Sequence, residues 1–168
     1  MTERAVTTAN VAAAVKCELA GDIVRAFGAL RCPAMGWSML PTVFPGDTLM
    51  VERVSPVQVC VGDVVVAGRE GKLCAHRVIG MSNELESRQW ITQGDAVPIP
   101  DRPVLANELL GRVNYLIRAG RLIKLRATLS SVESLVAKVI RHSEPAARVL
   151  VYLHKIVQIP EANLPCQE

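Results

Sequence analysis

Between Ala29 and Val113 the chain is divided into short apolar segments by closely spaced turn residues, and this pattern most restricts its fold. Short runs rich in Val, Ile and Leu that end at Gly, Pro, Asp or Asn are typical of β-strands. The sequence therefore predicts a domain of short strands with frequent turns over residues 29–126. The strands are expected at 49–54, 59–67, 73–79, 89–92, 110–117 and 121–125.

A helix is expected before the strands, from Asn10 to Phe27, with Gly28 as its stop. Its apolar residues recur at every fourth position, as on one face of an amphipathic helix. We expect this stripe to pack on the core rather than to anchor the chain in a membrane. It contains Val11, Val15, Leu19, Ile23 and Phe27.

Two further helices are expected after the strands. Ser130 and Glu133 have the spacing of a capping box at the start of the first. The second begins at Ser143-Glu144-Pro145 and runs to about Val157. The predicted organisation is an N-terminal helix packed on the core over residues 1–28, a β domain over 29–126 and a helical extension over 127–168. The fold class is mainly β, of the α+β type.

The charge of the chain excludes little. A net charge of +3 over 168 residues is too small to indicate nucleic-acid binding, and no nucleic-acid partner is expected. From Gly111 to Val132 the chain contains basic residues but no acidic residue. We interpret this stretch first as a solvated strand face and second as a patch for nucleic acid or for anionic lipid, the latter giving a peripheral contact with an anionic membrane. The basic residues are Arg112, Arg118, Arg121, Lys124 and Arg126.

Cysteine content and hydropathy limit the location. The chain has an odd number of cysteines and no Cys-x-x-Cys pair, so neither a disulfide framework nor a zinc site is expected. No metal or other cofactor is expected. The sequence shows no secretory signal peptide, and charged residues interrupt every long apolar window. A cytoplasmic or peripheral-membrane location is therefore predicted.

Ser38 is the first candidate for chemistry. Gly36 precedes it by two residues and Pro41 follows it by three, which predicts a locally rigid, sharply shaped loop. An ordinary tight turn would have the same composition. A serine hydroxyl is a weak nucleophile at neutral pH, so a catalytic Ser38 requires a base.

His76 is the candidate base, because it lies within an otherwise apolar strand, whereas His142 and His154 fit the surface pattern of the last helices. A buried core histidine remains the alternative. A histidine base needs a carboxylate that orients its ring, and Asp95 and Asp101 follow on one loop. Each aspartate could equally be a turn residue that bonds its own backbone.

Four segments in order resemble the conserved boxes of the type I signal peptidase superfamily. They are Ser38-Met39-Leu40-Pro41-Thr42 with Pro45-Gly46-Asp47, Gly62-Asp63-Val64-Val65, His76-Arg77-Val78-Ile79-Gly80, and Gly94-Asp95 through Asp101. With histidine in the third box, the chain resembles the endoplasmic-reticulum and archaeal branch of this superfamily. Because no anchor is evident, it also resembles small bacterial relatives. The resemblance implies a coiled, mostly antiparallel β fold and a serine endopeptidase that cleaves peptides or proteins after small residues.

The resemblance also implies roles for single residues. Ser38 would be the nucleophile and its backbone N–H an oxyanion donor, His76 the general base, and Asp101 the orienting carboxylate with Asp95 in support. Gly36 stands where some relatives carry a serine hydroxyl that also stabilises the oxyanion. The residues expected to shape the substrate site are Gly36, Trp37, Met39 and Pro41.

Two alternative functions are weighed against this one. Repressors of the SOS response share a Gly-x-Ser-Met box and cleave an Ala-Gly bond in their own chain, and Ala20-Gly21 is present here. Those proteins use lysine as the base, and no helix-turn-helix pattern precedes the strands. The other alternative is a peptidase fold that only binds peptides, which an intact set of Ser, His and Asp argues against.

Overall fold

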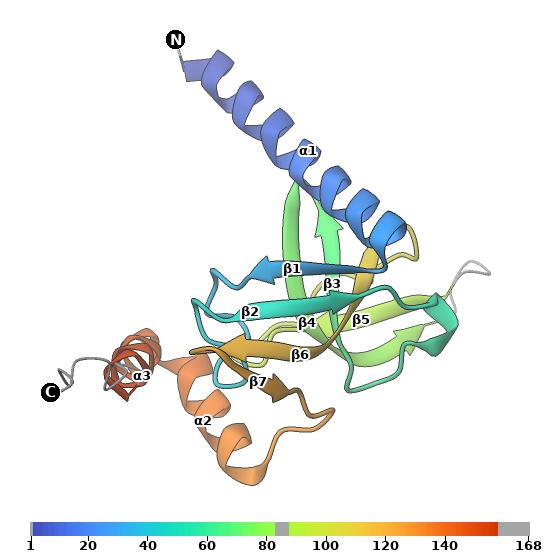
Figure 1. The fold of residues 1–168 in the computed structure, drawn as a ribbon. Helices are drawn as coiled ribbons and strands as arrows, with labels where there is room; N and C mark the ends of the chain where they lie inside the picture. Colours follow the sequence, from blue (N-terminus) through green and yellow to red (C-terminus); the bar gives the residue numbers. More distant parts are fainter. Residues whose placement is uncertain (1, 83–87, 158–168) are drawn as a thin grey trace, which may run out of the picture.

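A computed structural model describes residues 2–82 and 88–157 of the chain. One long helix precedes a sheet, and two shorter helices follow it (Figure 1). The elements in chain order are α1 (Thr2–Phe27), β1 (Ala29–Pro33), β2 (Thr48–Glu52), the 3-10 turn η1 (Pro56–Gln58), β3 (Val64–Arg69), β4 (Lys72–Ser82), β5 (Gln89–Gln93), β6 (Leu109–Arg118), β7 (Arg121–Lys124), α2 (Ser131–His142) and α3 (Glu144–Val157).

The described strands form one antiparallel sheet of seven strands, in the order β1-β2-β6-β3-β4-β5, with β7 also pairing with β6. The predicted class, mainly β with one N-terminal and two C-terminal helices, is therefore confirmed. β1 was not among the expected strands. The register shifts between Met50 and Val51, between Val66 and Ala67, and between Val78 and Gly80. Such bulges increase the local twist and bend of a strand.

β3 is buried on both faces, and this divides the apolar interior into two cores. Successive side chains of a strand point to opposite faces. Val64 and Val66 pack in one cluster with Val24 of α1, whereas Val65 packs in another with Trp90. The continuous Val-rich run thus covers both sides of the sheet at its centre.

α1 begins at Thr2, earlier than the expected Asn10, and ends at Phe27 as predicted. Gly28 takes a positive φ of 77° and donates its backbone N–H to the Val24 carbonyl, a geometry in which glycine carries no steric penalty. The predicted packing face is wrong: Val15, Leu19 and Phe27 are exposed.

The side of α1 that contacts the sheet contains smaller residues. Ala20, Gly21 and Val24 are buried, and Val24 is only 1% exposed. Small side chains let a helix approach a sheet closely, so burial of α1 follows residue size and not its most apolar stripe.

The C-terminal helices pack on the loop that carries Ser38. Leu40 and Phe44 of this loop form a third buried cluster with Ile140 of α2 and with Ala147 and Val151 of α3. Ser130 and Glu133 form the predicted capping box. Residues 158–168 of the predicted extension lie outside the described part of the chain.

His154 of α3 is not the surface residue predicted. Its ring stacks on Phe44, with centroids 3.6 Å apart and an interplanar angle of 14°. Partial burial, together with the nearby Arg118 guanidinium, lowers the pKa of His154, and Asp47 opposes this shift. His142, in contrast, is exposed as expected.

The basic stretch after Gly111 is partly neutralised by acidic partners. Arg118 pairs with the buried Asp47 at 2.6 Å, and Arg112 lies 3.4 Å from Asp63. Arg121 and Lys124 remain exposed on β7. No helix in the described part of the chain is both long enough and apolar enough to cross a membrane.

The packing of α1 predicts unequal effects of two valine truncations. Val24→Ala should lower the free energy of unfolding by about 2 kcal/mol, because it leaves a cavity in the core. Val15→Ala, the matched control on the exposed face, should change it by less than about 0.5 kcal/mol. Urea unfolding of both variants measures these changes; a larger loss for Val15→Ala would contradict the observed orientation of α1.

His154 predicts a pH-dependent stability. Its folded-state pKa lies below the ordinary value of about 6.5, so the unfolded chain binds the proton more readily. The stabilisation that neutral His154 gives to the folded state is therefore complete above about pH 6.5 and is lost as the pH falls below this value. The midpoint of thermal unfolding should decrease less steeply between pH 7 and 5 in His154→Phe, which retains a ring against Phe44. Identical pH profiles for the two proteins would contradict this role.

Candidate active site

The Ser38 loop joins β1 to β2, and its own apolar residues anchor it in the interior of the protein. Met39 and Leu40 are buried, the Leu40–Pro41 peptide bond is cis, and the Leu40 N–H donates to the Trp37 carbonyl. The Ser38 carbonyl accepts the Ala96 N–H at 2.8 Å, which ties the loop to the segment after β5.

Gly94 makes this close approach of two loops possible. A Cβ atom at position 94 would lie 2.6 Å from the Ser38 carbonyl oxygen and 3.0 Å from the Ser38 Cβ. Real Cβ atoms are essentially never so close to another heavy atom. Glycine is therefore required here by the backbone of the Ser38 loop.

His76 meets Ser38 from the middle of β4. Its Nε2 lies 3.0 Å from Ser38 Oγ, and its Nδ1 lies 2.5 Å from Asp101 Oδ2. The three side chains thus form a continuous chain of hydrogen bonds. The His76 side chain is only 14% exposed, so this contact is shielded from bulk water.

Asp101 is held in place by β5. Its Oδ2 accepts the Thr92 hydroxyl at 2.8 Å, and its backbone N–H donates to the Thr92 carbonyl at 2.8 Å. A β-bridge between Trp90 and Val104 secures the loop on the other side of Asp101. Thr92 had no role in the sequence analysis. The only sequence signal for this role was its place at the end of the expected strand 89–92, just before the loop with the two aspartates.

The order of partners determines which nitrogen of His76 carries the proton. An ionised carboxylate only accepts hydrogen bonds, so Nδ1 must donate to Asp101. In the neutral ring, Nε2 then has a free lone pair directed at the Ser38 hydroxyl. This arrangement suits removal of a proton from Ser38 and stabilises the imidazolium that results.

Asp95 does not contact His76, although it was predicted to support it. Its carboxylate accepts two hydrogen bonds from Arg77, at 2.8 and 2.9 Å, and one from the Thr42 hydroxyl at 2.5 Å. Both members of the Arg77–Asp95 pair are buried. Asp95 therefore connects the Ser38 loop to β4, and its contacts are those of a residue that holds the fold together.

A cleft of about 670 Å³ opens beside Ser38 and His76 and is lined mainly by apolar side chains. Of the residues expected to shape it, Gly36 and Met39 line this cleft, whereas Trp37 and Pro41 do not. Pro41 faces a separate cavity of about 240 Å³ near Arg77 and Arg118. A Cβ atom at Gly36 would meet open space, so the position is open to solvent or ligand.

One side of the cleft is a free strand edge. β4 pairs with β3 from Lys72 to Arg77, but β5 pairs with β4 only from Arg77 onward. The other edge of residues 72–76 has no strand partner in the described chain. Its backbone N–H and C=O groups can therefore pair with an extended peptide.

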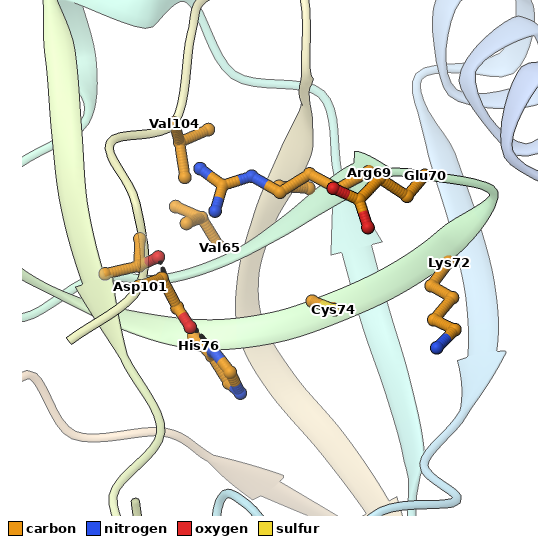
Figure 2. Close-up of a pocket in the computed structure, with 10 residues that line it drawn as sticks. Val65, Arg69, Glu70, Lys72, Cys74, His76, Asp101 and Val104 are labelled. Carbon is orange, nitrogen blue, oxygen red and sulfur yellow. Dashed lines mark hydrogen bonds and ion pairs between the residues drawn. The ribbon is translucent and has the colours of Figure 1, made fainter. Parts of the chain in front are cut away.

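A smaller cavity of about 190 Å³ lies on the Asp101 side of His76 (Figure 2). Arg69 lines it and lies 3.3 Å from Glu108 through its Nε atom. Cys74 borders both cavities. Burial and the nearby Asp101 raise the pKa of the Cys74 thiol, so it stays protonated and is a poor nucleophile.

The described residues contain no group of three or more His, Cys, Asp or Glu side chains that could hold a metal ion. The four cysteines of this part of the chain are free thiols. Comparison with models of protein families found no matching family, and comparison with curated proteins found no match.

The contacts of the two aspartates predict different effects on stability. Asp95→Asn removes the charge that balances buried Arg77 and should lower the free energy of unfolding by about 3 kcal/mol. Asp101→Asn, the matched control, leaves no buried guanidinium without its charge partner and should lower it by less than about 1 kcal/mol. Chemical denaturation of both variants tests the difference, and equal losses would contradict a structural role specific to Asp95.

Proposed function

We propose that this protein is a serine endopeptidase of the signal-peptidase type, with Ser38 as nucleophile, His76 as general base and Asp101 as the carboxylate that orients His76. The observation that carries the proposal is the hydrogen-bonded series from Ser38 Oγ through both nitrogens of His76 to Asp101. The order and spacing of the four sequence boxes support the same assignment.

The reaction would proceed by acyl transfer. His76 Nε2 takes the proton as Ser38 Oγ attacks the peptide carbonyl, and it then delivers that proton to the leaving amine. Water next attacks the Ser38 ester, with His76 again as base. The products are a new carboxyl terminus and a new amino terminus. The Ser38 backbone N–H is the proposed oxyanion donor.

The cleft supports a peptide as the substrate class. An extended chain could pair with the free edge of Lys72–His76 and present a carbonyl to Ser38. Ala34, Gly36 and Ala75 line the cleft, and apolar walls of this kind favour small apolar side chains near the scissile bond. Preference for small residues also follows from the resemblance.

Self-cleavage at Ala20-Gly21 receives no support from the structure. Both residues lie within α1 and are buried against the sheet. A peptide bond must be extended and accessible to enter the cleft beside Ser38. We therefore propose cleavage of other chains.

Reaction with an activated phosphonate probe tests the nucleophile. The wild-type protein should be labelled at Ser38, and Ser38→Ala should lose labelling and cleavage of Ala-x-Ala peptides. Asp101→Asn should slow labelling by about 10⁴-fold, the loss typical of Ser-His-Asp enzymes, because the ring is then held in the wrong tautomer. Ser55→Ala, which removes an exposed serine, is the matched control. Labelling that persists in Ser38→Ala would exclude the proposed mechanism.

A further inference from the structure

α1 contributes to the lining of the cleft and lies close to the β3–β4 hairpin (Figure 1). A Cβ atom at Gly68 would lie 3.5 Å from the Cβ of Cys17, so the helix and hairpin are in near contact. Lys16, the neighbour of Cys17, lines the same cleft as Ser38 and His76.

Lys16 brings the one permanent charge among the side chains that line this cleft. No ion pair joins Lys16 to another described residue. Asp22, an acidic residue of the same helix, pairs with Arg25 at 2.6 Å. An ammonium group beside an otherwise apolar cleft attracts a carboxylate, and because Lys16 is exposed, water and salt screen this attraction.

The part of β4 that α1 contacts sets the distance between Lys16 and the peptide carbonyl at Ser38. Gly68 is paired with Leu73, so the contact of Cys17 with Gly68 places this part of α1 at the hairpin end of the edge. Leu73 and Gly71 precede His76 by three and five residues. At ~3.3 Å per residue, this corresponds to about 10–16 Å along an extended chain.

We propose that α1 is the specificity wall of the cleft and that Lys16 binds an acidic side chain of the peptide, four or five residues before the scissile bond. The inference rests on the proposed function. The acyl side is assigned because the proposed function recognises small residues before the scissile bond, and the small residues Ala34, Gly36 and Ala75 line this cleft. The ligand is thus a peptide with a small residue at the cleavage position and Glu or Asp upstream.

Matched peptides test this preference. Each carries an Ala-x-Ala cleavage site and has Glu, Ala or Lys at the fourth or fifth residue before the scissile bond, or at the fourth or fifth residue after it. We expect the upstream Glu peptides to be cleaved about fivefold more efficiently than their Ala counterparts, through KM and not kcat. Lys16→Ala should remove the preference, Lys16→Glu should reverse it toward Lys, and added salt should weaken it.

A second readout needs no catalysis. Fluorescence anisotropy with the Ser38→Ala protein should give the same order of affinities for the same peptides. Lys138→Glu makes the same charge change on α2, outside the cleft, and should leave the order unchanged.

Each outcome decides between the two proposals. Ser38-dependent cleavage with equal use of Glu and Lys peptides would overturn the role of Lys16 and leave the peptidase function standing. Selective binding without cleavage would support Lys16 and reject the peptidase function. A shift in Lys138→Glu as large as that in Lys16→Glu would assign the effect to net charge and overturn the inference. Absence of both binding and cleavage would reject both.

Discussion

The site depends on the hydrogen bonds of a buried guanidinium, that of Arg77, the residue that follows His76 on β4. The guanidinium donates to both oxygens of Asp95 and to the carbonyls of Gly62, Arg126 and Ala127, at distances between 2.8 and 3.2 Å. These partners come from three separate segments of the chain. A buried charge is tolerated only when it is paired and hydrogen-bonded, so the segments must adopt one relative arrangement. That arrangement places the neighbouring residue, His76, at a fixed position.

The same network joins the Ser38 loop to the helices behind it. Thr42 donates to Asp95, and Arg141 of α2 donates to the Asp95 carbonyl at 3.0 Å. Leu40 and Phe44 are covered by α2 and α3. The loop is therefore held by polar contacts on one side and apolar packing on the other. The C-terminal helices help to hold the loop of the proposed nucleophile, and the predicted division at residue 127 does not separate them from the site.

Local patterns were sufficient to predict most strands, the capping box at Ser130, and Ser38 and His76 as candidate site residues, whereas Asp101 was placed before Asp95 only by the resemblance. They misassigned the packing face of α1 and the environment of His154, because both depend on contacts with distant segments. The most apolar stripe of α1 faces outward, while Ala20 and Val24 fit the sheet. The two aspartates of one loop could not be ranked by geometry from sequence, since Arg77 and Thr92 select between them only in the folded chain.

The residues proposed for catalysis and the residue proposed for selectivity lie on elements that are held in the fold to different degrees. Ser38, His76 and Asp101 stand on segments locked by buried contacts, and small displacements of such groups reduce catalysis strongly. Lys16 stands on a helix that touches the sheet through small residues such as Ala20 and keeps its other faces open. A substitution on the open side of α1 therefore changes the cleft wall without disturbing the hydrogen bonds of the site. This separation would let related chains vary their peptide preference while the Ser38–His76–Asp101 geometry is retained.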